Sequence, residues 1–448
     1  MQLDFLYSSD DLHDIANQII HKSLQMGATD AQVEISENIS NQVEVLNQEL
    51  ETFETSHENQ LTITLFKQHK KSHIGITRID LNSIDKIIQQ GLEIANYTQE
   101  DPHNGLLEKK YLVNNPMSLD LGLYNPINLN HQELIKEVLD LEQLGLAQTQ
   151  ISSSDGAAIS LNQYSFVIAN SNGLNQGYKT SRYSKSISLI GTNQRGMQSD
   201  YWYNSNRDYH QLASNLSIAE QAAQRVQRKL ININYHASKP KIIFENSIAK
   251  SLIGSLIAGL SGSNLYRQLS FLNNSFQQQI FPEWFNLHED PFVFGGLASC
   301  YFDNEGSQVT KSQIISNGKV NHYFLSSYSA RKMNLAPTGN AGGCHNLFVE
   351  ANLIGNLDKL IQIMKNGIII IDTFGNGLNL VTGDYSVGAG GLIVENGEIL
   401  GYSENLTISG NLRDIFQNIL YVNNNYNSGH IQCGDMLINA EIIQVSSN

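Results

Sequence analysis

The sequence lacks the segments that direct a protein to a membrane or across one. It contains no run of about 18 apolar residues, so we expect no membrane-spanning helix. Residues 1–10 have neither a basic region nor an apolar core, so we expect no secretory signal peptide. The three cysteines, Cys300, Cys344 and Cys433, are too few and too widely spaced for a disulfide framework. These absences predict a cytoplasmic protein without membrane contact.

Basic residues are also scarce. The chain has 28 Lys and Arg against 43 Asp and Glu, which gives a formal net charge of −15. Proteins that bind nucleic acids usually present clustered basic side chains to the phosphates. The densest basic runs here are Lys70-Lys71 and Lys109-Lys110, which we interpret as solvated loop charges. We therefore expect no nucleic-acid partner.

The common signatures of catalytic sites are missing as well. No His-Glu-x-x-His and no Gly-x-Ser-x-Gly motif occurs. His69 and His73 are four residues apart in an extended segment, where that spacing spans about 13 Å, too far for one metal ion. Cys344 and His345 are adjacent, and adjacent residues of a strand point to opposite faces, so the pair is a poor catalytic dyad. We interpret Cys344 as a small buried residue in a glycine-rich turn.

Hydrophobic residues make up 41% of the chain, enough for a substantial core, and their spacing changes along the sequence. Helical spacing predicts helices over residues 10–25, 83–97, 131–146, 209–230, 247–260, 357–365 and 412–419. Alternating spacing predicts early strands over residues 31–35, 42–46, 61–66 and 72–77. Asn317-Gly318 and Asn396-Gly397 predict hairpin turns in the second half.

These patterns predict an α+β protein. A mixed helix and antiparallel-sheet amino-terminal region is followed by a β-rich, barrel-like carboxy-terminal domain with packed helices. The expected ranges are 1–100 for an amino-terminal α/β domain and 101–235 for a central strand and helix region that continues the amino-terminal half. The β-rich domain is expected over residues 236–448.

Six ordered segments carry a family resemblance. They are Leu-Tyr-Arg-Gln-Leu-Ser-Phe-Leu at 265–272, Gly-Leu-Ala-Ser-Cys-Tyr-Phe-Asp-Asn-Glu-Gly at 296–306, Ser-Ser-Tyr-Ser-Ala-Arg-Lys at 326–332, Pro-Thr-Gly-Asn-Ala-Gly-Gly at 337–343, Thr-Gly-Asp-Tyr-Ser at 382–386 and Thr-Ile-Ser-Gly-Asn-Leu-Arg-Asp at 407–414. With them the chain resembles the TldD/PmbA peptidase family, in its PmbA (TldE) branch, over essentially its whole length. The resemblance implies a two-part architecture and a role in cytosolic proteolysis.

The resemblance also locates a zinc motif that this chain does not have. In the TldD branch, a helix with His-Glu-x-x-x-His, completed by a later Cys, holds zinc. The matching positions here are Gly254, Ser255 and Gly259. Glycine has no side chain to ligate a metal, and serine is a poor general base. Cys433 aligns better with a later strand, so the ligand role is not carried over to it. We expect no metal and no catalytic residue in this chain.

For function, the resemblance implies a non-catalytic subunit that pairs with a zinc-bearing TldD-like partner. Such a subunit completes a cavity for unfolded or leader peptides, in keeping with the family's links to microcin B17 maturation and antitoxin degradation. Two alternatives stay open: an autonomous metallopeptidase with unrecognised ligands, and a homodimeric peptide-binding module. A gyrase modulator acting on DNA, an older description of the family, disagrees with the charge of −15.

Candidate peptide contacts lie in the glycine-rich part of the second half: Tyr328, Arg331, Gly342, Gly343, His345 and Tyr385. The bare backbone at Gly342 and Gly343 would let an extended peptide approach and pair by strand addition. Arg331 and His345 would hold acidic or carboxy-terminal groups, and the two tyrosines would stack on side chains. The alternative interpretation is that Arg331 caps a helix end and that the glycines only make turns.

Overall fold

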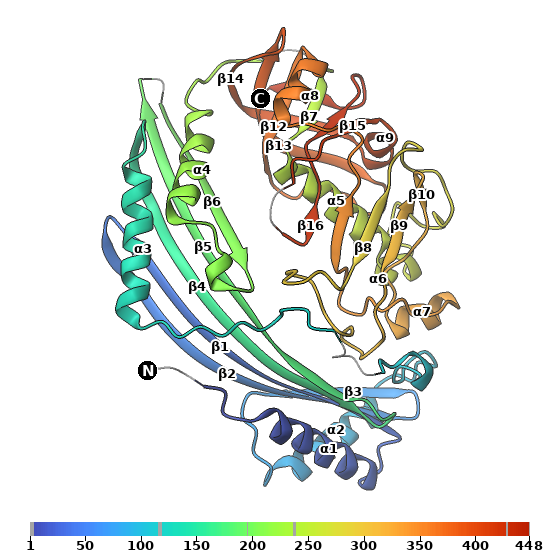
Figure 1. Cartoon of the computed structure of the whole chain (residues 1–448). Helices are drawn as coiled ribbons and strands as arrows, with labels where there is room; N and C mark the ends of the chain where they lie inside the picture. Colours follow the sequence, from blue (N-terminus) through green and yellow to red (C-terminus); the bar gives the residue numbers. More distant parts are fainter. Residues whose placement is uncertain (1–3, 115–118, 195, 236–238, 427–428, 448) are drawn as a thin grey trace.

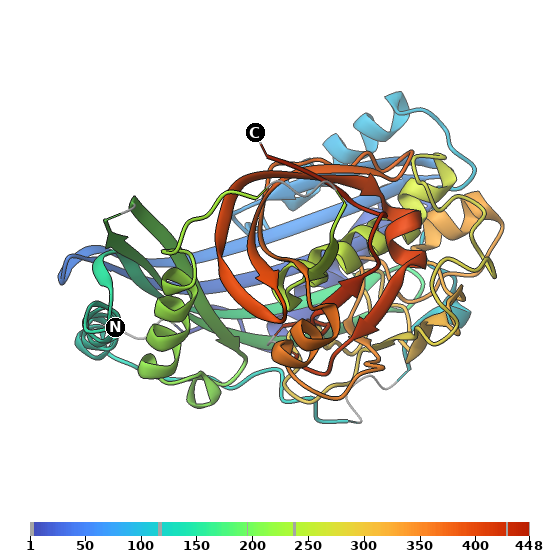
Figure 2. The same cartoon turned by 90° about the horizontal axis from the view of Figure 1, so that it is seen from above.

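A computed structural model describes residues 4–114, 119–194, 196–235, 239–426 and 429–447 (Figure 1). Its helices and three β-sheets confirm the predicted α+β class. A six-stranded sheet dominates the amino-terminal half, and a five-stranded and a seven-stranded sheet build the carboxy-terminal half. Seen from above, the carboxy-terminal strands curl over the long sheet, which confirms a barrel-like β-rich part (Figure 2).

The elements alternate along the chain as follows. The helices, including two 3-10 turns, are α1 Ser9–Gln25, α2 Ile84–Tyr97, η1 Lys109–Tyr111, α3 His131–Leu146, η3 Tyr209–Gln211, α4 Asn215–Gln227, α5 Asn246–Leu260, α6 Gly262–Tyr266, α7 Ser327–Met333, α8 Leu357–Met364 and α9 Leu412–Gln417. The strands are β1 Asp30–Leu46, β2 Glu49–Lys67, β3 Lys70–Ile76, β4 Ile151–Asn170, β5 Asn175–Asn193, β6 Gly196–Asn206, β7 Lys241–Phe244, β8 Leu287–Asp290, β9 Ser312–Ser316, β10 Lys319–Val320, β11 Asn346–Val349, β12 Gly367–Phe374, β13 Asp384–Glu395, β14 Glu398–Asn411, β15 Ile419–Val422, β16 Ile431–Gln432, β17 Met436–Ile438 and β18 Gln444–Ser447.

Two early predictions needed correction. The separate strands predicted over residues 31–35 and 42–46 are one strand, β1, because its polar middle pairs with β2 on one side and β4 on the other. The helix predicted over residues 209–230 is shorter. It begins at Asn215, because the Ser214 side chain accepts a hydrogen bond from the Ser217 amide and caps the helix. The other predicted helices are present, and both Asn-Gly pairs form hairpin turns with positive φ at each residue.

The six-stranded sheet has strand order β3-β2-β1-β4-β5-β6 and is antiparallel throughout. Along β1, buried residues alternate with more exposed ones, so one face of the sheet is apolar. Helices α1 and α2 pack on that face around Val33 and Ile35. Helices α3 and α4 cover the same face further along, around Val43 and Val45. All four helices therefore lie on the apolar face.

The opposite face of this sheet carries polar side chains, and we call it the polar face. On β1 and β2 it consists of Glu34, Ser36, Asn38, Ser40, Gln42, Glu44, Thr52, Glu54, Ser56, Glu58, Gln60 and Thr62. Register pairs such as Glu34 with Thr62 and Ser36 with Gln60 hold these side chains opposite one another. The long sheet curves around the carboxy-terminal half, which lies on its inner side (Figure 1).

The seven-stranded sheet, with order β15-β17-β7-β12-β13-β14-β18, is buried on both faces at its centre. Along β12, Ile368 and Ile370 point into the main core with α5, while Ile369 and Ile371 pack with α8. This explains the uninterrupted run of isoleucines in β12, because a strand covered on both sides needs apolar residues at every position.

Buried charges join the two halves of the molecule. From α4, Arg225 contacts Asp200 of β6 at 3.0 Å and Glu245, the residue before α5, at 3.2 Å. Lys229 contacts Asp200 at 2.8 Å and Asp372 of β12 at 2.9 Å. Because an ion pair removed from water is sensitive to geometry, this cluster fixes where α5 begins relative to the long sheet.

Among the described helices, none is long and apolar enough to cross a membrane. The three cysteines are free. Residues 236–238, where the third predicted domain begins, lie outside the described residues.

Candidate functional site

Helix α5, which holds the positions of the missing zinc motif, is anchored at its start. The Asp435 carboxylate accepts a hydrogen bond of 2.8 Å from the Asn246 amide. Buried leucines and isoleucines along the helix, such as Leu252 and Leu256, pack into the main core. This leaves Gly254 on the partly exposed side, where an added Cβ would have no atom within 4 Å.

A cavity of about 510 Å³, here the α5 cavity, opens beside Gly254. Gly342 and Gly343 form part of its opposite wall, so the structure brings together three residues that the sequence singled out. Its polar groups are hydroxyls and one amide, from Ser261, Ser263, Ser326, Ser329 and Asn340. The described residues of the lining include no ionisable side chain. The α5 cavity thus offers hydrogen bonds but no general acid or base.

The other two motif positions do not face this cavity. The Ser255 hydroxyl donates to the Ser251 carbonyl at 3.0 Å, one helical turn back. Gly259 is buried, and an added Cβ would lie 2.9 Å from Leu272 Cδ1. Gly259 is therefore explained by close packing of α5 against the segment that contains Leu272.

Zinc, which the family resemblance implies for the TldD branch, does not fit these residues. Gly254 and Gly259 offer no ligand atom, and the Ser255 hydroxyl is bonded to its own helix. Within the described parts of the chain, no three His, Cys, Asp or Glu side chains are grouped to hold a metal. Cys433 is fully buried, and burial raises the pKa of its thiol to about 12. The Cys433 thiol donates to the Gly434 carbonyl at 3.3 Å.

The glycine-rich loop is built around Asp303 and Asn304. The Asp303 carboxylate accepts from the Ala341 amide at 2.9 Å, and the Asn304 amide donates to the Ala341 carbonyl at 2.9 Å. Gly342 has φ of 110°, and a Cβ there would lie 2.5 Å from Asn304 Nδ2. Gly343 has φ of 122°, but a Cβ there would meet nothing within 4 Å. Gly343 therefore exposes its backbone, whereas Gly342 is required by packing.

Tyr328 and Arg331 lie on α7 and hold a distant segment in place. The Tyr328 hydroxyl donates to Asp101 Oδ2 at 2.7 Å, which lowers the pKa of that carboxyl well below its usual range. The Arg331 guanidinium donates to the carbonyls of His103, Gly105 and Leu106 at 2.7–3.2 Å. With its fourth contact, to a serine of α7, four of its five N–H groups are engaged. Arg331 was expected to bind an acidic group of the substrate; in this structure its guanidinium is engaged by backbone carbonyls.

His345 belongs to a buried polar network. Its amide and its Nδ1 both contact Glu289 Oε1, at 2.6 and 3.0 Å, and Asn340 donates to the same carboxylate. Burial alone would lower the pKa of His345, but its hydrogen bonds with Cys300 and Glu289 raise that pKa to about 10. A charged imidazole paired with Glu289 in the interior positions the loop rather than meeting a peptide.

Tyr385 is a core residue. It lies in β13 with 7% of its surface exposed, and it belongs to the main hydrophobic cluster. Burial raises the pKa of its hydroxyl to about 12. Tyr385 was expected to stack on a bound side chain; in this structure its ring is covered by the protein itself.

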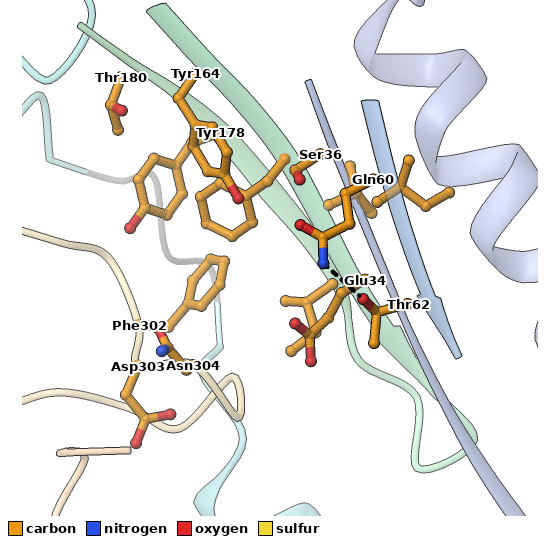
Figure 3. Close-up of a pocket in the computed structure, with 14 residues that line it drawn as sticks. Glu34, Ser36, Gln60, Thr62, Tyr164, Tyr178, Thr180, Phe302, Asp303 and Asn304 are labelled. Atoms are coloured by element: carbon orange, nitrogen blue, oxygen red, sulfur yellow. Dashed lines mark hydrogen bonds between the residues drawn. The ribbon is translucent and has the colours of Figure 1, made fainter. Parts of the chain in front are cut away.

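A second cavity, here the sheet cavity, was not foreseen from the sequence. It has a volume of about 330 Å³ and lies between the polar face and residues 302–304 (Figure 3). Glu34, Gln60 and Thr62 line it from the sheet, and Asp303 lies on the opposite side. Burial raises the pKa of Asp303 to about 6. At neutral pH the Asp303 carboxylate is therefore mostly ionised.

The two cavities meet at one contact. Asn304 lines the sheet cavity, and its side chain lies against Gly342, which lines the α5 cavity. A third cavity, of about 630 Å³, continues along the polar face and shares Ser36, Gln60 and Tyr164 with the sheet cavity. The candidate site is thus an elongated cleft over the polar face that leads to α5.

One sequence signal pointed to the sheet cavity. Polar residues alternate with apolar ones over residues 31–35 and 42–46, which predicts strands with one polar face. Nothing in that pattern shows that residues 302–304, far along the chain, cover this face. Long-range packing therefore had to be seen in the structure.

Two sequence profiles of one protein family match the chain. The PmbA/TldA metallopeptidase central domain matches residues 124–230, and the PmbA/TldA metallopeptidase C-terminal domain matches residues 237–444. A metalloprotease PmbA homolog from Haemophilus influenzae is 34% identical over 403 residues, covering 90% of this chain and 88% of the relative. Metalloprotease PmbA from Escherichia coli is 33% identical over 418 residues, covering 93% of this chain and 92% of the relative.

Two solved structures share the fold. A candidate modulator of DNA gyrase from Bacteroides thetaiotaomicron has a TM-score of 0.90 at 24% identity, covering 97% of this chain and 98% of that one. TldE from Thermococcus kodakarensis has a TM-score of 0.82 at 18% identity, covering 97% and 100%. At these identities the likeness supports the fold and carries no further conclusion.

Proposed function

Since the chain belongs to the PmbA/TldD metallopeptidase family, we propose that it is the peptide-binding subunit of a metallopeptidase complex. In this proposal a TldD-like partner holds the zinc, and the present chain completes the cavity that admits unfolded or leader peptides. The proposed compartment is the cytoplasm, in keeping with three free cysteines.

One observation carries the proposal: the α5 cavity lies beside Gly254, and its described lining contains no ionisable side chain. Gly254 has no side chain that could ligate a metal, and an added Cβ there would meet no atom within 4 Å. The polar groups of the described lining are hydroxyls, one side-chain amide and backbone groups. Such groups bind peptide backbone without cleaving it. The open backbone at Gly343 adds a place where an extended chain can approach.

The cleft has the form that an extended peptide needs. Two cavities lie along the strands of the polar face, and the α5 cavity lies beyond the Asn304–Gly342 contact. Serine, threonine, asparagine and glutamine side chains dominate this face, so it can satisfy the hydrogen bonds of a peptide of varied sequence. This supports recognition of backbone more than of one particular sequence.

The test is reconstitution with a TldD-like partner. We expect the purified chain alone to contain no stoichiometric zinc by elemental analysis and to cleave no peptide. Mixing with the partner is expected to give chelator-sensitive cleavage that is lost when the partner's motif Glu is replaced by Gln. Ser255→Ala in the present chain should leave that cleavage unchanged, because its hydroxyl is bonded within α5.

Two results would favour the alternatives. One tightly bound zinc per chain, lost together with a cleavage activity of this chain alone, would support an autonomous metallopeptidase. Peptide binding by a stable self-dimer that does not associate with the TldD-like partner would support a homodimeric binding module. Either result would overturn the proposed division of labour.

A further inference from the structure

The sheet cavity has an aromatic wall. Phe166 lies between Tyr178 and Phe302, with ring centroids 4.7 and 6.0 Å away, and Tyr164 stacks on Phe166 at 5.7 Å. Tyr164 remains 38% exposed, so part of its ring faces the space. The faces of aromatic rings attract cations, and a tyrosine does so strongly enough to matter at a partly exposed site.

The other side of the sheet cavity is negatively charged. Glu34 is an exposed residue of β1, and its carboxylate projects toward the space between the sheet and residues 302–304 (Figure 3). Across it lies Asp303, whose oxygens accept the amides of Glu305, Ser307 and Ala341. Within the described chain neither carboxylate forms an ion pair, and the described lining contains no basic side chain. Glu34 therefore places a negative charge without an ion-pair partner beside the aromatic rings, whereas the Asp303 carboxylate is held by backbone amides at the edge of the cavity.

The geometry points to a binding site for the basic side chain, lysine or arginine, of an extended peptide in the sheet cavity. This inference rests on the proposed function, because it takes the cleft to hold a peptide. A volume of about 330 Å³ accommodates one long side chain with water, and is at the lower end for ligand pockets. The neighbouring cavity along the same strands gives room for the rest of the chain.

The experiment measures binding of a fluorescent, polar, extended peptide to the full chain by anisotropy, with and without the partner. One central residue is varied among lysine, arginine, norleucine, citrulline and glutamate. We expect the lysine and arginine peptides to bind about tenfold more tightly than norleucine and citrulline, the size of one charge-assisted contact. The glutamate peptide is expected to bind most weakly.

Variants assign the preference to this cavity. Glu34→Gln should weaken binding of the lysine peptide about tenfold and leave the norleucine peptide unchanged. Tyr164→Leu should weaken the lysine peptide about threefold through loss of the ring face. The matched control is Glu54→Gln, an exposed glutamate on the polar face outside the lining, which should change neither peptide.

The outcomes separate this inference from the proposed function. If peptides bind without preferring a basic residue, or if Glu34→Gln weakens all of them equally, only the basic-side-chain site is refuted. If no peptide binds in either setting, the proposed function and the site fail together. Competition by N-acetyl-lysine-methylamide at the peptide's own concentration would show a site for free amines and overturn the peptide assignment.

Discussion

The α5 cavity and the sheet cavity share the Asn304–Gly342 contact, yet their chemistry differs. The described lining of the first has glycine, serine and one asparagine but no ionisable side chain. The lining of the second includes Glu34, Asp303 and an aromatic wall. The comparison teaches that the charge of the candidate site lies over the long sheet and not beside α5. In the proposed function, the charged cavity contributes to peptide binding and the uncharged one takes no part in proton transfer.

The largest expected effect tests the contact between the two cavities. Gly342→Val places a β-branched residue at a φ of 110° and displaces the exposed side-chain amide of Asn304, so we expect a loss of about 3 kcal/mol in the free energy of unfolding. Chemical denaturation measures it. Gly343→Val, with a similar φ and open space, should cost only the backbone part, about 1–2 kcal/mol. Equal losses would show that the Asn304 contact does not matter.

A second prediction concerns the charge of the sheet cavity. The pKa of Asp303 is raised from 3.8 to about 6 by burial, so the folded state keeps its proton at pH values where the unfolded chain has lost it. The stability that Asp303 contributes is complete below about pH 4 and is lost as pH rises through about 6. Relative to Asp303→Asn, the wild type should therefore lose up to about 3 kcal/mol between pH 4 and 7. Denaturant midpoints of both proteins across this range check it, and parallel pH profiles would contradict it.

A third prediction separates architecture from peptide binding. Arg331→Ala leaves the carbonyls of residues 103, 105 and 106 without their donor, so we expect a loss of about 2 kcal/mol in stability. Peptide affinity, measured well below the unfolding midpoint, should stay the same. Lys332→Ala is the matched control on α7, because its ion pair with Asp101 is partly exposed and should contribute less to stability than the backbone contacts of Arg331. A selective loss of affinity in Arg331→Ala would restore it to the substrate site.

The smallest expected effect compares two glycines of α5. Gly254→Ala adds a methyl group in open space and improves helix propensity, so stability should rise by about 1 kcal/mol. Gly259→Ala brings the same gain but presses against Leu272, so the net change should be a loss of about 1 kcal/mol. Thermal unfolding of the two variants measures the difference. If both substitutions stabilise the protein, the segment around Leu272 can move to accommodate the added methyl group.

Much of the fold was predictable, because local signals and global packing agree in most elements. The capped helices α1 and α3, the two Asn-Gly turns and the isoleucine run of β12 all follow from nearby residues. The polar middle of β1 was misread as a break, because its pairing partners are distant in the sequence. Strand pairing across the sheet compensates for weak local propensity there.

The candidate site was less predictable than the fold. Gly254, Gly342 and Gly343 do meet in one cavity. Arg331 and Tyr385, however, are residue types that often contact ligands. In this structure Arg331 donates to a backbone carbonyl and Tyr385 is buried in the core, and only these contacts reveal the difference. The sheet cavity depends on residues 302–304 folding back over β1, a contact that no local pattern encodes. In each case the environment of the residue depends on how deeply it is buried and on which residues it contacts. The sequence alone gives neither.

The pairing of β1 with β4 also has a consequence for synthesis. Ile35 of β1 pairs with Val167 of β4, so roughly 130 residues must be added before the edge of β1 can be covered. At ordinary translation rates this interval is on the order of ten seconds. During that time the nascent β1–β2 hairpin presents an unpaired strand edge and an apolar face in the same molecule. The nascent chain therefore carries an edge that is prone to non-specific strand pairing until β4 has been synthesised.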